Sequence, residues 1–316
     1  MSRQRGVALI TVLLVVALVT VVGAGLIARQ QLAIRSSGNL LVQNQAWHYA
    51  LGGELLAKAI LREDLSRGPL DHAGEPWAQP MKPFPFDEGG TLHLRIEDAS
   101  GRFNLNALAL HDNAGLQAFG QFQRLLLLLD IDEPYAERLR DWLDEDEQAA
   151  PGGAEDNDYL LLQPAYRAAN RALAEVSELR LLLSMKDEDY QRLLPHVTAL
   201  PSDAHLNLNS AGPLVLASLA DGLSPQLAQG LMMNGEAHGF ASVEAFIAQL
   251  GTAGQTVVGQ PLAVGSRYFR VIGDVELAGR RQVLVSLLRR EADGALTVLS
   301  RDLGQSGLYK ERDDDA

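Results

Sequence analysis

Residues 1–30, MSRQRGVALITVLLVVALVTVVGAGLIARQ, place arginines and a glycine directly before a long apolar run. Residues 7–28 carry no charge, and as a helix they would span about 33 Å, against about 30 Å for the hydrocarbon core of a membrane. A secretory signal peptide has a shorter apolar region of about 7–15 residues. Arg3 and Arg5 predict that the short N-terminal side stays in the cytoplasm. The stretch therefore predicts a single-pass transmembrane helix over residues 7–28, with the bulk of the chain on the far side.

The junction at Gly6 carries a second indication. RQRG followed by VALITVLLVVAL resembles the class III leader of type IV pilins and pseudopilins. The resemblance implies that a prepilin peptidase cuts after Gly6, removes the leader of residues 1–6, and leaves Val7 as a methylated N-terminus. The fifth residue counted from Val7 is Thr11, where most members of these families carry Glu.

Composition restricts the function of the remaining chain. The 316 residues carry a net charge of −13, which becomes −15 when Arg3 and Arg5 leave with the leader (−13 − 2 = −15). Binding to nucleic acid needs Lys and Arg at the phosphates, so a chain this acidic is a poor nucleic-acid binder and is better suited to divalent cations. No cysteine is present, which excludes disulfides and cysteine chemistry but is compatible with export.

Beyond the anchor, the apolar pattern predicts that one long helix continues to about residue 65, where Gly68-Pro69 ends it. The apolar seam of this helix consists of Leu40, Trp47, Leu51, Leu55 and Ile60. A proline-rich loop follows. The segment TLHLRIED at 91–98 then alternates apolar and polar residues, which predicts a half-buried strand.

The pattern of apolar and polar residues changes twice more along the chain. Residues 103–262 read as almost entirely helical, with short helices expected at 116–129, 135–143, 176–185, 187–195, 213–220, 225–233 and 242–250. Residues 263–305 alternate again and predict three antiparallel strands with turns at Ala278-Gly279 and Asp293-Gly294, before a flexible tail at 306–316. We therefore expect an α+β pseudopilin fold. Residues 29–102 and 263–305 would form a long helix packed on a small antiparallel sheet, and 103–262 would be a large all-α inserted domain.

The predicted insert contains a short internal sequence repeat. GRFNLNALAL at 101–110 and AHLNLNSAGPLVL at 204–216 share an Asn-Leu-Asn core, and Asn106 and Asn209 are expected to cap helices. The second copy resembles the start of a helix-hairpin-helix module. Such modules bind DNA through backbone amides and nearby basic residues, yet residues 219–239 contain no Lys or Arg.

The densest chemical pattern is DWLDEDEQAAPGGAEDNDY at 141–159, which holds eight carboxylates and no basic residue. Pro151-Gly152-Gly153 would let the backbone fold back, so that both acidic clusters face one point. Ca²⁺ takes six to eight oxygen ligands from such loops. The spacing is not that of an EF-hand, so a solvated acidic loop and a metal site both remain open on the residues alone.

An ordered series of motifs runs through the whole chain: NLN, DWLDED, GAEDNDY, PAYRAAN at 164–170 and VSELRLL at 176–182. This series resembles the K-type minor pseudopilins of type II secretion systems. The resemblance implies calcium in the helical insert, with the candidate ligands Asp144, Asp146, Glu155, Asp156, Asp158, Asn170 and Glu178.

The same resemblance implies the biological setting. It implies a bacterial inner-membrane protein with a cytoplasmic N-terminus and a periplasmic bulk. Such a protein helps to start and cap the tip of the pseudopilus that exports folded proteins across the outer membrane. The implied partners are the I-type and J-type minor pseudopilins, the pseudopilus, the prepilin peptidase and secreted substrates. A tip subunit has no predecessor ahead of it, which would account for Thr11 in place of Glu.

No catalytic constellation competes with this interpretation. The seven histidines form no HExxH pair and no GxSxG elbow occurs, so we expect no enzymatic activity. The alternatives are a membrane-anchored periplasmic helix-hairpin-helix binding protein and a metal-dependent anchored hydrolase.

Overall fold

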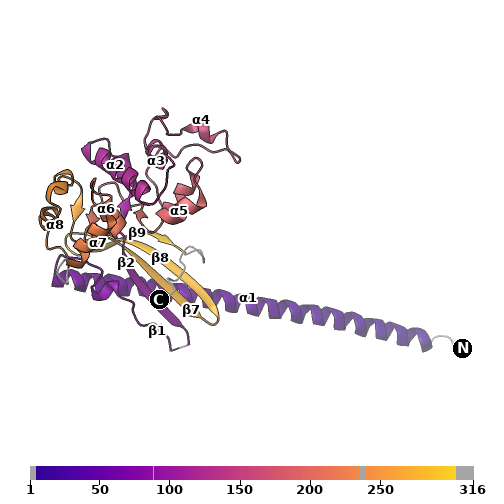
Figure 1. Cartoon of the computed structure of the whole chain (residues 1–316). Coiled ribbons are helices and arrows are strands. Elements are labelled where there is room, and N and C mark those ends of the chain that lie inside the picture. The colour runs from indigo at the N-terminus through magenta and orange to yellow at the C-terminus, as the bar shows by residue number, and fades with distance from the viewer. Residues whose placement is uncertain (1–4, 88, 235–238, 304–316) are drawn as a thin grey trace.

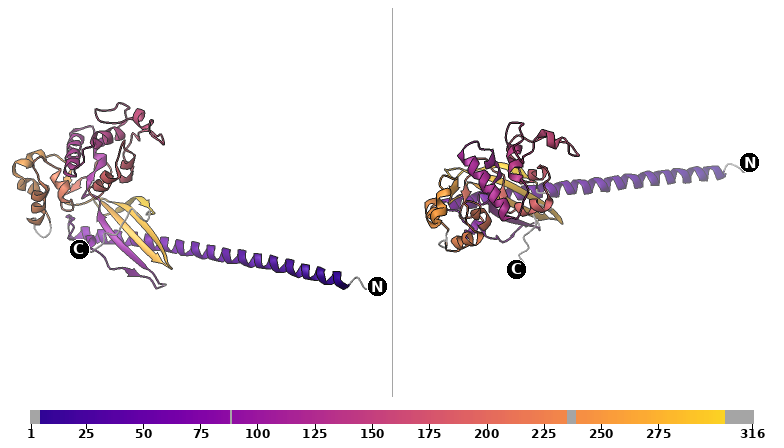
Figure 2. Two further views of the ribbon diagram at one scale, coloured as in Figure 1. Left: turned by 45° about the vertical axis from the view of Figure 1, so that its right-hand side comes forward. Right: turned by 45° about the horizontal axis from the view of Figure 1, so that its top comes forward.

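A computed structural model of the chain describes residues 5–87, 89–234 and 239–303. Its longest element is α1, Arg5–Arg67, a single helix of 63 residues (Figure 1). From residue 8 to residue 41 every residue of α1 is exposed except the half-buried Gly23. The N-terminal half therefore projects as a bare helix from the folded body, and the remaining half lies against a sheet (Figures 1 and 2). The expected long helix, half anchor and half packed, is confirmed.

The sheet has five antiparallel strands in the order β1-β2-β7-β8-β9. Their bounds are β1 Phe84–Pro85, β2 Thr91–Asp98, β7 Tyr268–Leu277, β8 Arg280–Arg290 and β9 Leu296–Asp302. The first predicted strand, β2, thus joins the last three in one sheet by pairing with β7, although about 170 residues of sequence separate these two strands. The β7–β8 turn is built from Ala278 and Gly279, both with positive φ (49° and 72°), as the hairpin prediction required. The predicted α+β pseudopilin fold is confirmed.

Small residues make the contact between α1 and the sheet. Ala46, Ala50, Gly53 and Ala57 are buried at intervals of four, three and four residues, which places them on one face of the helix. A Cβ added at Gly53 would lie 3.1 Å from Cδ2 of Leu92, so glycine there permits the close approach.

The apolar seam of α1 is therefore not the face that packs on the sheet. Leu40 and Leu55 are 58% and 65% exposed, and Trp47, Leu51 and Ile60 are only half-buried. The large apolar residues of α1 flank or oppose the face that contacts the sheet, because the sheet lies too close to this face for large side chains.

The insert contains seven short α-helices among the described residues, with one large buried core of its own. They are α2 Asn113–Leu128, α3 Tyr135–Leu143, α4 Asp156–Tyr159, α5 Asp187–Leu193, α6 Pro213–Ala217, α7 Pro225–Asn234 and α8 Val243–Gln249. Three 3₁₀ helices, Leu105–Ala109, Val176–Leu181 and Gly251–Thr256, complete it, while a fourth, Pro76–Ala78, lies outside the insert.

Two pairs of very short parallel strands correct the prediction of an all-α insert. β3 (Phe103–Asn104) pairs with β4 (Val197–Thr198), and β5 (Leu206–Asn207) pairs with β6 (Leu262–Ala263). Each pair closes one unit of the insert, at about 101–202 and 204–265. Two-residue strands have no periodicity that a sequence pattern could show.

The Asn-Leu-Asn copies work differently from the predicted helix caps. The 3₁₀ helix Leu105–Ala109 is capped by Asn104, whose side chain accepts a hydrogen bond from the backbone N–H of Asn106. Helix α6 begins after Gly212 without a side-chain cap. The Asn106 amide instead binds the backbone of Leu173 (N–H at 2.8 Å and C=O at 3.0 Å) and the carbonyl of Leu200 (2.9 Å).

Asn209 repeats this arrangement in the second unit. Its amide exchanges two bonds with the backbone of Phe240, at 2.7 and 3.1 Å, and donates to the carbonyl of Val264 at 3.2 Å. In both units the second Asn therefore holds together segments that are distant in sequence.

An ion pair between a buried glutamate and an exposed arginine fastens α1 to the far strands of the sheet. Glu54, 2% exposed, accepts from Arg301 Nε (2.7 Å), Ser286 Oγ (2.7 Å) and Lys58 Nζ (2.9 Å). Burial alone would raise the pKa of Glu54, but these donors outweigh it and lower the pKa to about 2.

Replacing Glu54 by Gln should therefore destabilise the fold in a pH-dependent way. We expect a loss of about 2–3 kcal/mol at neutral pH, because Arg301 is left facing a neutral group. The depressed pKa means that the contribution of Glu54 is fully present above its ordinary value of 4.5 and is lost as the pH falls toward 2. Denaturant unfolding of both proteins in detergent, from pH 7 to pH 2, measures it.

Glu63→Gln is the matched control. Glu63 lies on the same helix in an exposed pair with Arg67, so its loss should cost less than about 0.5 kcal/mol. An equal effect of the two substitutions, or a constant difference between wild type and Glu54→Gln down to pH 2, would contradict the assigned role of Glu54.

Candidate metal site in the insert

The acidic loop leaves α3 after Leu143 and returns at α4. Buried Asp141 shapes it by accepting from the backbone N–H of Ala150 at 2.9 Å. A Cβ on Gly153 would lie 1.8 Å from Oδ2 of Asp141, so only glycine allows the chain to pass there. The turn at Pro151-Gly152-Gly153 thus folds the loop back, as its composition predicted.

Folding the loop back brings three of the predicted ligands together. Carboxylate oxygens of Asp144, Asp146 and Glu155 lie within 4.8 Å of one another. Within the part of the chain that the structure describes, both oxygens of Glu155, a residue only 2% exposed, have no hydrogen-bond partner, and Oδ1 of Asp144 has none either. Unpaired buried carboxylate oxygens are costly unless something else binds them.

Asn170 adjoins this cluster from the PAYRAAN segment. Its Nδ2 donates to the main-chain oxygen of Asp146 at 3.2 Å, and its buried Oδ1 is unpartnered. The residue adopts a positive φ of 47°, which Asn tolerates better than most side chains. An amide oxygen and three carboxylates are the donor set that Ca²⁺ prefers.

The other predicted ligands have different partners in this structure. Asp156 accepts from the Arg167 guanidinium and from Ala168 N at 2.9 Å. Asp158 accepts from Glu155 N at 3.1 Å, at the start of α4. Glu178 accepts from Ala174 N (2.6 Å), Glu175 N (3.1 Å) and Arg171 (3.2 Å). These three side chains hold the surrounding backbone rather than face the cluster.

The electrostatics of the cluster match its lack of partners. Burial, followed by the charges of Asp144, Asp141 and Asp146, raises the pKa of Glu155 to about 7. Burial and the charge of Asp146 also raise the pKa of Asp144. The protein alone therefore provides too little positive charge here to keep these carboxylates ionised at low cost.

Three aromatic residues that the acidic pattern does not indicate pack together beside the loop. Trp142 and Tyr159 are fully buried and meet edge to face at 5.0 Å, and Tyr166 packs on Tyr159 at 5.5 Å. The Tyr166 hydroxyl donates to the carbonyl of Leu181 at 2.8 Å. These aromatic residues belong to the motifs DWLDED, EDNDY and PAYRAAN, so each motif contributes to the packing beside the acidic loop.

The predicted processing site lies at the other end of the chain. Gly6 and Val7 belong to the first turn of α1, which begins at Arg5, and leader residues 1–4 lie outside the described residues. Thr11 donates its hydroxyl to the carbonyl of Ala8 at 2.9 Å, so the helix itself satisfies it within the apolar segment.

The helix-hairpin-helix expectation falls on α6 and α7, which contact each other. Residues 235–238 of the predicted module lie outside the described residues. The described part of the module presents no basic side chain to a phosphate.

Comparison with known proteins identifies the family. Residues 101–202 and 206–265 match two family models, both described as type II secretion system (T2SS), protein K. These ranges coincide closely with the two units of the insert.

Relatives match over nearly the whole chain. The chain is 53% identical to the type II secretion system protein K of Pseudomonas aeruginosa, covering 96% of this chain and 94% of the relative. It is 36% identical to that of Klebsiella pneumoniae, covering 92% and 93%. It also resembles a chain in the crystal structure of the GspK-GspI-GspJ complex from enterotoxigenic Escherichia coli, with a TM-score of 0.76 and 30% identity over 84% of this chain and 97% of that one. The chain thus belongs to the type II secretion system protein K family, the K-type minor pseudopilins that its motifs resemble.

Proposed function

We propose that this chain initiates and caps the tip of a periplasmic pseudopilus, in a complex with I-type and J-type minor pseudopilins. The observation that carries the proposal is the likeness over most of the chain to a subunit of the GspK-GspI-GspJ complex. The role is structural rather than catalytic. The helix-hairpin-helix alternative has no comparable support.

The shape of the molecule supports a position at the tip. The insert gathers at the end of the body away from the projecting half of α1 (Figures 1 and 2). A domain of about 160 residues would obstruct subunits stacked above it in a shaft, but not at an end. Thr11 agrees, because a tip subunit has no predecessor whose N-terminal amine a fifth-residue Glu would meet.

The surface of α1 offers a contact site for partner helices. Leu40, Leu41 and Leu55 are 58%, 70% and 65% exposed beyond the anchor, on parts of the helix that the sheet leaves open. Partner helices running alongside α1 would cover them, since apolar surface favours burial.

We expect Leu41→Arg and Leu55→Arg to reduce co-purification with the I-type and J-type pseudopilins by at least tenfold. A buried arginine without a partner would oppose docking, while the fold should be unaffected because both leucines are exposed. Pull-down from membranes that coexpress all three proteins measures the effect.

Leu161→Arg provides the control, because this leucine is 84% exposed in the insert, away from α1. Equal binding by all variants would contradict the α1 contact. Gold labelling of the chain along the whole length of isolated pseudopili, rather than at one end, would contradict the tip position.

The topology proposed for the chain is a single inner-membrane span with a periplasmic body. It depends on the exposed apolar part of α1 and on Arg3 and Arg5 before it.

We expect cleavage between Gly6 and Val7, because glycine has no side chain to obstruct a peptidase subsite. Intact-mass analysis of the chain from cells with a prepilin peptidase tests this, and cells without the peptidase are the control. Cleavage after Ala24 or Ala28, with loss of the apolar helix, would contradict it.

We also propose that the insert binds Ca²⁺ through Asp144, Asp146, Glu155 and Asn170. The convergence of their oxygens and the unpartnered state of Glu155 support this set. The ion would supply the positive charge that the loop lacks, and would fix the segment from α3 to the PAYRAAN motif.

Calcium should therefore slow hydrogen exchange in residues 141–170, and the double substitution Asp144→Asn/Glu155→Gln should abolish this local protection. Carboxylates bind calcium only when ionised, so the protection should weaken from pH 7.5 to pH 5.5 as Glu155, with its pKa raised to about 7, takes up a proton. Hydrogen-exchange mass spectrometry with calcium or chelator measures both effects.

Glu145→Gln/Glu147→Gln is the matched control, since it removes the same charge from exposed positions of the same loop. Identical exchange with calcium and with chelator in the wild type would leave the loop as a solvated acidic surface.

A further inference from the structure

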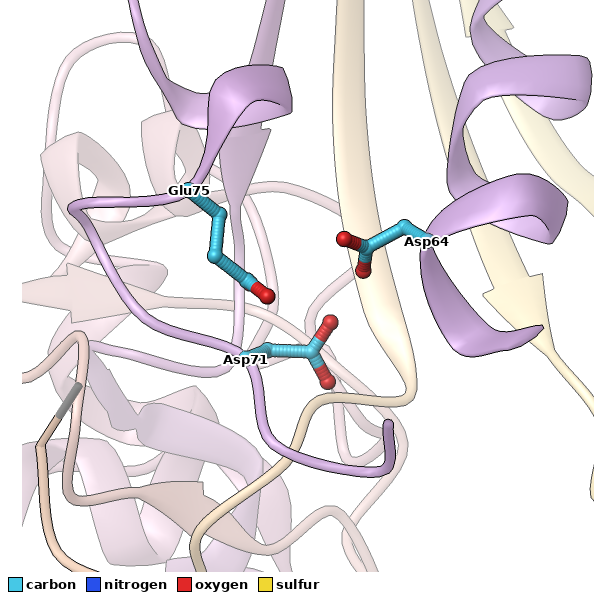
Figure 3. A group of neighbouring side chains, drawn as sticks. All are labelled: Asp64, Asp71 and Glu75. Atoms are coloured by element: carbon cyan, nitrogen blue, oxygen red, sulfur yellow. The ribbon is translucent and has the colours of Figure 1, made fainter. Parts of the chain in front are cut away.

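A second group of carboxylates lies outside the insert, where α1 ends. Asp64 is in the last turn but one of the helix, and Asp71 and Glu75 follow in the segment that leads to β1. One oxygen from each lies within 4.8 Å of the others. Figure 3 shows the three side chains converging on one point from two sides.

Two of these side chains are deeply buried and incompletely bonded. Asp64 is 7% exposed and Asp71 is fully buried, yet Oδ2 of Asp64 and Oδ1 of Asp71 have no hydrogen-bond partner among the described residues. The other oxygen of Asp71, Oδ2, accepts from Ser266 N at 2.7 Å and from the Arg290 guanidinium. Arg290 reaches Asp64 less well, with Nη1 at 3.8 Å from Oδ2.

Glu75 is held in place from its outer side. Its Oε2 accepts from the backbone N–H of His72 at 3.0 Å and from the Trp77 indole at 2.8 Å. These two donors orient the carboxylate toward Asp64 and Asp71 (Figure 3).

Charge at this point does not balance. With all three carboxylates ionised, the group and the Arg290 guanidinium that contacts Asp64 and Asp71 carry a net charge of −2 (−3 + 1 = −2). A divalent cation would cancel the deficit.

We propose that Asp64, Asp71 and Glu75 bind a divalent cation of the Ca²⁺ class. Calcium–oxygen distances of about 2.3–2.6 Å allow ligand oxygens to lie up to about 5 Å apart, which accommodates the observed separation. A surface pocket lined by Glu63, Asp64 and Trp77 leads to the group and would provide entry for the ion.

The position of the site gives the cation a structural effect. The backbone of Asp71 donates to the carbonyl of Val264 (3.2 Å) and accepts from Asn207 Nδ2 (2.9 Å), both in the second unit of the insert. A cation at Asp71 would therefore tie the end of α1 to the base of the insert and restrict the orientation of the insert on the pseudopilin body.

Terbium luminescence tests the proposal, because Tb³⁺ occupies oxygen-rich calcium sites and emits when a nearby tryptophan is excited. The full chain in detergent would carry Asp144→Asn/Asp146→Asn/Glu155→Gln, which removes the acidic cluster of the insert. With Trp77 bonded to Glu75, we expect this protein to retain Tb³⁺ emission that Ca²⁺ displaces, and a melting temperature that Ca²⁺ raises by several degrees. Adding Asp64→Asn or Glu75→Gln should abolish both responses.

One control makes the result specific. Glu188→Gln removes an exposed carboxylate that does not line this pocket, and it should leave both responses intact. The proposal is overturned if the loop-substituted protein shows neither response. It is also overturned if Asp64→Asn and Glu75→Gln leave the emission and the calcium-dependent rise in melting temperature unchanged. A third contrary result is that Asp64→Asn raises the melting temperature equally with calcium and with chelator. The last result would indicate carboxyl groups that share a proton.

Discussion

The architecture depends on one constraint: an insert of about 160 residues must leave and rejoin the sheet between two adjacent strands. Asp98 ends β2 and lies opposite Phe269 on β7, so the exit and return points are neighbours. Asp98 Oδ2 accepts from Ser266 Oγ and from Asn207 Nδ2 (2.9 Å), which ties both points to the second unit of the insert. Because this junction closes locally, the insert can have its own core while the sheet keeps its pairing.

Sequence patterns predicted the parts whose signal is local. The period of two in 91–98 and in the last strands, and the long helical run, were sufficient for the helix and the sheet. The apolar seam does not identify the face that packs on the sheet, because Ala46, Ala50 and Gly53 are buried there for their small size. The sequence predicts Asn106 as a cap, whereas its partners Leu173 and Leu200 lie 67 and 94 residues away.

The two acidic groups differ in the density of charge in the surrounding sequence. Asp144, Asp146 and Glu155 belong to a dense run of charge, so the sequence pointed to them as possible ligands. Asp64 and Asp71 are seven residues apart across the end of a helix, and only the turn after Arg67 brings them together. Asp156, Asp158 and Glu178 show the reverse case, since a carboxylate in an acidic stretch can serve the backbone instead of the cluster.

The buried carboxylates of this chain differ in how many hydrogen-bond donors surround them. Glu54 has three donors, and its pKa falls to about 2. Glu155 and Asp64 have oxygens without partners, and burial raises their pKa values to about 7. The first arrangement is an ion pair that fixes α1 on the sheet without a further ligand. The other two lack positive charge, and both lie where segments are held together: the acidic loop with PAYRAAN, and the end of α1 with the insert. The two proposed cations would complete both links and would hold the insert more rigidly on the body of the protein.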